Sequence, residues 1–363
     1  MSSPRNTSDP HHLSRRAVLK TAITMATGAM ASSIARARTP APKILRYSDH
    51  EPFGGMRTRF LKDVFFPAIE RESSGRLKIE AHWDGELAAA YDALGAAGKS
   101  PRVDMATAVP EYTANELPLH QIFKSFPVGP TGDKQVGFFR QVYRDVPEFS
   151  DELARNDVVP VYIGTGYPVS FFSKAPLDGL KGVAKGRWRT ASFWHRDFLR
   201  SVGATPVSIP WGPQVNEAFG QGTLDGLMVN VDSGYILKVH EMAPNVLASR
   251  DLWLGHAYPV VMKKSVWNGL AAEDREAIQR AAERAYQTLG GVMDASFDVQ
   301  IEDLRAAGAR VRVVGREEAL AWQVDTRYQQ AQHAWAEQQT ANGIHNARSV
   351  IDSVAAVLNA SMK

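Results

Sequence analysis

Strand-like and helix-like patterns alternate early in the chain, and this alternation restricts the fold more than any other feature of the sequence. Residues 43–48 and 77–83 mix apolar and polar side chains as short strands do, and a glycine-containing break follows each run. Between them, apolar side chains recur at helical spacing from Phe60 to Ile69, in a helix that Pro67 is expected to kink. This order predicts an α/β fold with at least partly parallel sheets.

The same alternation continues along the rest of the chain. Short apolar runs typical of buried strands occur at residues 158–163, 207–209, 227–231 and 311–314. Apolar side chains at helical spacing predict a long helix over about residues 273–307, with an apolar stripe interrupted only at Gly290-Gly291. A chain of 363 residues is long enough for two domains of ordinary size.

The first 37 residues have the order of an export signal. The pair Arg15-Arg16 precedes an apolar-to-small stretch at 21–34, and residues 35–37 form an A-x-A-like cleavage site. The arginine pair resembles a twin-arginine signal, although Val18 stands where phenylalanine is usual. A stretch of about 14 residues is shorter than the ~20 that span a bilayer. We therefore expect cleavage near Ala37 and a periplasmic mature protein that does not itself span the membrane.

The positive charge is concentrated in this leader. Residues 1–37 hold five cations and one anion, so their removal changes the formal charge from +3 to −1. A mature protein this close to neutrality gives no indication of nucleic-acid binding. The absence of cysteine excludes disulfides, thiolate metal sites and cysteine nucleophiles.

No motif for catalysis, a cofactor or a metal stands out. The histidines lack the spacing of metal ligands, and the glycine patterns of serine hydrolases and dinucleotide-binding proteins are missing. Residues 98–100 imitate the end of a P-loop, but Ala93 replaces its first glycine. We expect no enzyme, no metal and no cofactor. The rival hypothesis is a secreted hydrolase, for example a glycosidase that uses Glu51 and Asp84.

Five segments resemble one family in their order and spacing. Residues 180–192 (LKGVAKGRWRTAS), 203–211 (GATPVSIPW) and 217–226 (EAFGQGTLDG) follow one another as they do in the extracytoplasmic solute receptors of tripartite ATP-independent periplasmic (TRAP) transporters. Residues 74–77 and 267–282 also have counterparts in that family. The resemblance covers nearly all of residues 43–300.

The resemblance implies a periplasmic-binding-protein fold. It has two α/β domains, joined by crossing strands and a long spine helix, which close on a ligand in the cleft between them. Domain I would comprise residues 38–165 and about 252–310, and domain II about 166–251. The C-terminal strand and helices, about 311–363, would pack across both domains.

The resemblance also nominates Arg189 as the residue that binds the ligand's carboxylate, with Arg187 as a surface neighbour. A planar guanidinium offers parallel N–H donors that match a carboxylate and keeps its charge at physiological pH. Without the family context, an arginine at this place is more typical of a solvated strand end.

The sequence departs from the family pattern near a second expected ligand residue. Val229 stands where the family usually has asparagine, and Asn230 follows it. A shift of one residue turns a side chain to the other face of a strand. Either the strand has a bulge, or Asn230 is not a ligand and Ser233 substitutes for it.

Aromatic side chains are candidates for the remaining walls of the cleft. Trp211 and the pair Phe193-Trp194 would supply apolar walls, with core packing as the alternative for each. Tyr112 lies where a cleft loop of domain I is expected, and its hydroxyl would reach the ligand. Glu51 would suit a cationic group on the ligand, although a loop glutamate is usually solvated.

These patterns favour a periplasmic receptor that binds a small organic acid, closes around it and delivers it to the membrane subunits of a TRAP transporter. The alternative is a sugar or peptide receptor of an ATP-driven importer.

Overall fold

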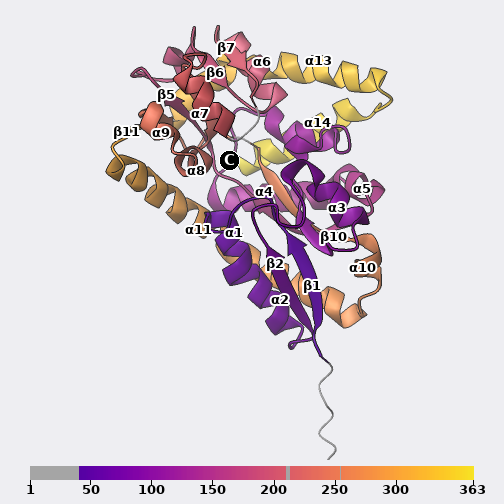
Figure 1. Cartoon of the computed structure of the whole chain (residues 1–363). Coiled ribbons are helices and arrows are strands. Elements are labelled where there is room, and N and C mark those ends of the chain that lie inside the picture. The colour runs from indigo at the N-terminus through magenta and orange to yellow at the C-terminus, as the bar shows by residue number, and fades with distance from the viewer. Residues whose placement is uncertain (1–40, 210–212, 254) are drawn as a thin grey trace, which may run out of the picture. The chain divides into compact units, whose positions relative to one another are not determined.

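The computed structural model describes residues 41–209, 213–253 and 255–363, which belong to one compact unit that begins at Ala41. The predicted leader, residues 1–37, lies outside the described residues, and so does Trp211. Within the described part, the chain builds two separate sheets with helices around them (Figure 1). This mixed architecture confirms the predicted α/β class.

The first sheet has five strands in the order β2-β1-β3-β10-β4. The strands are β1 (Lys43–Ser48), β2 (Leu77–His82), β3 (Met105–Thr107), β4 (Val158–Thr165) and β10 (Ala257–Lys263). Strand β1 pairs in parallel with β2 and β3, whereas β10 is antiparallel to both β3 and β4. Strand β10, which comes late in the sequence, therefore lies between β3 and β4 in a sheet whose first strand begins at Lys43.

The second sheet has six strands in the order β11-β9-β5-β8-β6-β7. They are β5 (Val169–Ser173), β6 (Arg187–Arg189), β7 (Thr205–Val207), β8 (Gly226–Asn230), β9 (Asn245–Ala248) and β11 (Arg310–Val313). Strand β5 is antiparallel to its neighbours β8 and β9, and the remaining pairs are parallel. The predicted strand at 207–209 was placed two residues too late, because the Ile209 carbonyl oxygen accepts a hydrogen bond from Arg189 Nε rather than joining the sheet.

Helices surround both sheets. The α-helices are α1 (Met56–Phe60), α2 (Phe66–Glu72), α3 (Ala93–Lys99), α4 (Gly132–Asp145), α5 (Glu148–Arg155), α6 (Phe193–Ser201), α7 (Pro213–Gly220), α8 (Val231–Ile236), α9 (Val239–Met242), α10 (Lys264–Asn268), α11 (Ala272–Ala306), α12 (Arg316–Asp325), α13 (Tyr328–Ala341) and α14 (Ala347–Ser361). Short 3₁₀ turns are η2 (Ala90–Asp92), η3 (Pro110–Tyr112), η4 (Leu119–Ser125) and η5 (Leu180–Val183).

Proline changes the helix that was predicted between β1 and β2. The turn before α2 is a π-helical segment, η1 (Leu61–Phe65), which separates α1 from α2. Pro67 has no backbone N–H to donate to the preceding turn, and a π-turn accommodates that missing hydrogen bond. The expected kink therefore takes the form of a π-helical turn.

Helix α11 is the predicted spine. Its 35 residues extend over about 52 Å at 1.5 Å per residue. Its first half packs on the core of the first sheet through Ala281, Ala285 and Leu289, and its second half packs on the core of the second sheet through Phe297 and Ile301. Figure 1 shows it running alongside both regions. The Gly290-Gly291 pair does not interrupt the helix.

The C-terminal helices contact elements beside both sheets. Helix α14 packs on α4, which covers the first sheet, and α12 packs on η5, which belongs to the second-sheet region. Helix α13 contacts both α6 and η4. In the described part of the chain, no helix combines the length and the apolar character needed to cross a membrane.

Candidate functional site

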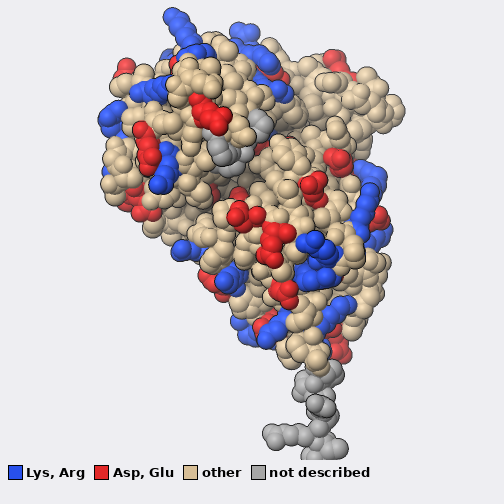
Figure 2. Space-filling model, in the orientation of Figure 1, with Lys and Arg blue, Asp and Glu red and all other residues tan. Residues whose placement is uncertain are grey.

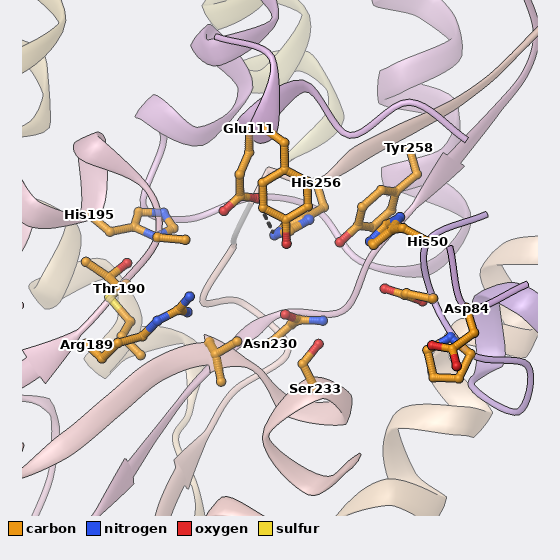
Figure 3. A pocket seen from close by; sticks show the side chains of 16 residues that line it. His50, Asp84, Glu111, Arg189, Thr190, His195, Asn230, Ser233, His256 and Tyr258 are labelled. Atoms are coloured by element: carbon orange, nitrogen blue, oxygen red, sulfur yellow. Dashed lines mark ion pairs between the residues drawn. The ribbon is translucent and has the colours of Figure 1, made fainter. Parts of the chain in front are cut away.

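A cavity of about 280 Å³ lies where loops from both sheets meet. Its walls are formed by His50, Glu51, Pro52, Asp84, Glu111, Tyr112, Arg189, Thr190, Ala191, His195, Met228, Val229, Asn230, Ser233, His256 and Tyr258. A hollow is visible in the middle of the face shown in Figure 2, with acidic side chains along its lower edge. Figure 3 shows that the lining side chains point toward one another from opposite sides.

Strand ends explain why these residues meet. His50 and Glu51 follow β1, and Thr190 follows β6. Glu111 and Tyr112 lie in η3, just after β3. Parallel strands present their carboxyl ends at one edge of a sheet, which is where α/β proteins commonly bind ligands. The cavity therefore uses the ligand-binding edges of two sheets at once.

Arg189 is the last residue of β6 and lies in the cavity wall. It is 2% exposed, and its Nε donates a hydrogen bond to the Ile209 carbonyl oxygen at 2.9 Å. Burial lowers the pKa of this guanidinium from its usual value, although an arginine remains charged at physiological pH. Arg187, two residues earlier, instead forms a two-point ion pair with Asp225, at 2.9 and 2.7 Å.

A buried polar cluster lies beside Arg189. The Lys124 ammonium forms a close ion pair with Glu111, and Lys124 Nζ lies 3.2 Å from His256 Nε2. Burial, reinforced by the charge of Arg189, lowers the pKa of Lys124 well below its usual value. Burial and the neighbouring Lys124 lower the pKa of His195 to about 3, so this imidazole is neutral at physiological pH.

The opposite end of the cavity is acidic. Glu51 Oε2 lies 2.8 Å from Arg57 Nη2, and the same guanidinium also holds the buried Asp49. Two carboxylates thus share one cation. Asp84 lines this end as well, and its backbone N–H donates to the Glu51 carbonyl oxygen. Figure 3 shows Asp84 and His50 across the cavity from Arg189.

Asn230 and Ser233 both line the cavity from the end of β8 and the start of α8. Strand β8 pairs with β5 in continuous register, from Gly226 to Asn230, without a bulge. Asn230 Nδ2 donates to Asp232 Oδ1, as does the Ser233 backbone N–H. Because Asn230 is the last residue of its strand, it reaches the cavity without a change of register.

Four of the six predicted site residues line this cavity: Arg189, Tyr112, Asn230 and Ser233. Phe193 is not among the lining residues. Its ring lies tilted beside the Trp194 ring at a centroid distance of 4.9 Å and packs against the apolar core. The sixth, Trp211, lies outside the described residues.

Sequence reasoning missed several lining residues, notably Glu111, His195, His256 and Tyr258. None of them belongs to a recognisable motif. Two of them lie close in sequence to residues that were predicted. Glu111 directly precedes Tyr112, and His195 lies in the first turn of the helix that follows Arg189. His256 directly precedes β10 and Tyr258 lies in it, and this strand joins the first sheet only through the tertiary fold.

The structure places the two carboxylates of the hydrolase hypothesis. Glu51 and Asp84 line the same cavity, and Glu51 forms an ion pair with Arg57. Within residues 41–363 as far as they are described, no group of three or more His, Asp and Glu side chains is arranged to hold a metal ion.

Comparison with known proteins gives a family match over most of the chain. A family described as "Bacterial extracellular solute-binding protein, family 7" matches residues 63–338. The chain is 24% identical over 226 residues to an ectoine/5-hydroxyectoine-binding periplasmic protein of Ruegeria pomeroyi, covering 56% of this chain and 60% of the relative. It is 27% identical over 117 residues to an ectoine-binding periplasmic protein of Halomonas elongata, covering 31% and 33%. The chain thus matches less than two thirds of the length of these relatives.

Solved structures show the same fold over nearly the whole described chain. A TRAP solute-binding protein from Rhodoferax ferrireducens, in complex with benzoate, has a TM-score of 0.75 at 18% identity, covering 88% of this chain and 98% of that one. The ectoine-binding protein of a Halomonas elongata TRAP transporter has a TM-score of 0.73 at 20% identity, covering 88% and 100%.

Proposed function

Because the chain belongs to the bacterial extracellular solute-binding proteins of family 7, we propose that it is the solute receptor of a TRAP-type transporter and binds a small organic acid. The structural relatives include proteins solved with benzoate, pyroglutamate and glucuronate, all of which are carboxylates. The predicted resemblance to TRAP receptors is confirmed at the level of the family. The bound acid and its mode of binding are our proposals.

The buried guanidinium of Arg189 is the observation that supports an acid as the ligand. Arg189 is 2% exposed and lines the cavity, so its cationic guanidinium lies next to any anion that enters it. A carboxylate matches the fork of N–H donors in two places. Asn230, Ser233 and Tyr112 supply polar groups around the same space.

We propose that ligand binding closes two domains on each other. The first would contain residues 38–165 and about 252–310, and the second about 166–251. The described chain passes between the two sheets from β4 to β5, from β9 to β10 and from α11 to β11. Such crossings are suitable hinges, since few residues need to change their backbone angles. A ligand that contacts both sides favours the closed form by its additional affinity for it.

Residues 1–37 would direct the protein to the periplasm and be removed near Ala37. The membrane subunits of the transporter would then be the partners that recognise the closed, ligand-bound receptor. The family is extracellular by its description, which supports a location outside the cytoplasm.

A thermal-shift screen of residues 38–363 tests this proposal. Specific binding raises the stability by about RT ln(1 + [L]/Kd). Stabilisation by a class of carboxylates, lost in an Arg189→Gln variant, is the expected result. Stabilisation by neutral sugars or peptides alone would instead indicate the receptor of an ATP-driven importer, and turnover of a glycoside would indicate a hydrolase.

A further inference from the structure

We propose that Glu111 and His195 form a second recognition point beside Arg189, which selects acids with a hydroxyl group on the carbon next to the carboxylate. The inference rests on the proposed binding of the carboxylate by Arg189. It adds a substrate class, the 2-hydroxy acids, and assigns the residues that distinguish these acids from their analogues.

Glu111 offers a hydrogen-bond acceptor to the cavity. Its Oε2 is engaged by Lys124 and lies 3.6 Å from His256 Nε2. Its other oxygen, Oε1, has no hydrogen bond within the described residues, and the side chain lines the cavity. Figure 3 shows that Glu111 and Arg189 reach into the cavity from different walls. A hydroxyl group on the ligand could donate a hydrogen bond to this Oε1 atom.

His195 is the second component. The side chain is 1% exposed, lines the cavity and forms no hydrogen bond with any described residue. An imidazole that lines the cavity without a protein partner is available to hydrogen-bond a ligand that reaches it. The imidazole is neutral, since burial and Lys124 lower its pKa to about 3. One ring nitrogen can donate and the other can accept, which matches the two roles of a hydroxyl group.

The local charges favour a hydroxyl over an ammonium group. Lys124 forms an ion pair with Glu111, and a bound carboxylate would add one negative charge beside Arg189. An ammonium on the adjacent carbon would add a third cation next to Arg189 and Lys124, two buried cations that already oppose each other. A hydroxyl group makes the same hydrogen bonds without that cost.

Calorimetric titration of the purified protein with matched acids tests the inference. The probes are propanoate, lactate and alanine, and phenylacetate, mandelate and phenylglycine, so that each series keeps one carbon skeleton. We expect the hydroxy acid to bind about tenfold or more tightly than the parent acid and the amino acid in at least one series. If parent acids bind as tightly as hydroxy acids, or amino acids bind more tightly, the inference is wrong while the receptor proposal stands. If no acid of either series binds, the inference fails, and the thermal-shift screen decides separately whether the receptor proposal stands.

Variants then assign the selection to these residues. His195→Leu removes both ring nitrogens, and the double variant Glu111→Leu with Lys124→Met removes the acceptor together with its ion-pair partner, so that no buried charge is left unpaired. In each, we expect the preference for the hydroxy acid to fall below about threefold, while the parent acid binds within about twofold of its original affinity. The control is Glu302→Gln, which removes an ion pair with Arg305 far along α11. A preference that persists in both variants would overturn the assignment.

Discussion

Arg57 holds the buried Asp49 in a two-point ion pair behind the cavity wall. Nη1 lies 2.6 Å from Oδ2 and Nη2 lies 2.8 Å from Oδ1. The Tyr47 hydroxyl donates to the same carboxylate, and Glu51 contacts the same guanidinium from the cavity side. Although burial opposes ionisation, the charge of Arg57 leaves the pKa of Asp49 below its usual value. The loop after β1 is thus fixed in position by charge.

The first prediction concerns this pair. Asp49→Ala should lower the free energy of unfolding by about 3–5 kcal/mol at pH 7, because it leaves Arg57 buried with only the partly exposed Glu51. Urea unfolding measures the change. The stability that Asp49 provides is present above its unfolded pKa of about 4 and is lost as the pH falls through the lower folded value.

The exposed pair Asp197–Arg200 is the control for this prediction. Asp197→Ala removes an ion pair between side chains that are 47% and 60% exposed, so a change under about 1 kcal/mol is expected. Equal effects at both aspartates would show that burial of the Arg57 pair does not matter.

The second prediction concerns the ligand. Arg189→Gln should weaken the binding of any carboxylate ligand by a factor of about 100 or more, since a charged hydrogen bond in a buried site loses its donor. The matched control is Arg187→Gln, which alters an arginine on the same strand that pairs with Asp225 on the surface. Titration calorimetry compares the two. Similar losses in both variants would contradict the role of Arg189.

The third prediction concerns pH. Burial, and then the charge of Glu51, raise the pKa of Asp232 to about 7. The folded protein therefore retains a proton that the unfolded chain releases above pH 4, and the stability falls as the pH rises toward 7. Asp232→Asn keeps the acceptor for Asn230 and removes the titration. It should stabilise the ligand-free protein by about 2–3 kcal/mol more at pH 8 than at pH 5.

Thermal denaturation at both pH values measures this difference. Asp225→Asn is the comparison, because the hydrogen bond and charge of Arg187 lower the pKa of Asp225. Its substitution should cost stability at neutral pH, and the cost should disappear in acid. A benefit from Asp232→Asn that does not change with pH would show that Asp232 is not protonated in the folded protein.

The fourth prediction uses the two glycines of α11. A Cβ at Gly290 would overlap the backbone nitrogen of Asp133, whereas a Cβ at Gly291 meets nothing within 4 Å. Gly290→Ala should therefore lower the free energy of unfolding by about 1–3 kcal/mol. Gly291→Ala should raise it by up to about 1 kcal/mol, because alanine favours the helix. Denaturant titration of both variants decides whether α4 packs this closely on the spine.

The local patterns of the sequence were sufficient for the class of the fold and for most of its elements. Strand β1 was predicted with the bounds that it has, and the spine helix was predicted to within one residue at each end. Both signals are local, because they depend on side chains repeating at the period of a strand or a helix. The position of Arg189 was also accessible, since it ends a strand within a segment of family-like sequence.

Which residues share the cavity was decided by the tertiary structure. His256 enters the site because β10 pairs with β3 and β4, from which it is separated by about a hundred residues or more of sequence. Phe193 was expected at a wall and lies against the core, since the first turn of α6 directs His195 to the cavity instead. Chain pairing over such distances leaves no periodic pattern in the sequence. The elements could therefore be derived from local physical chemistry, and the site required the fold that brings their ends together.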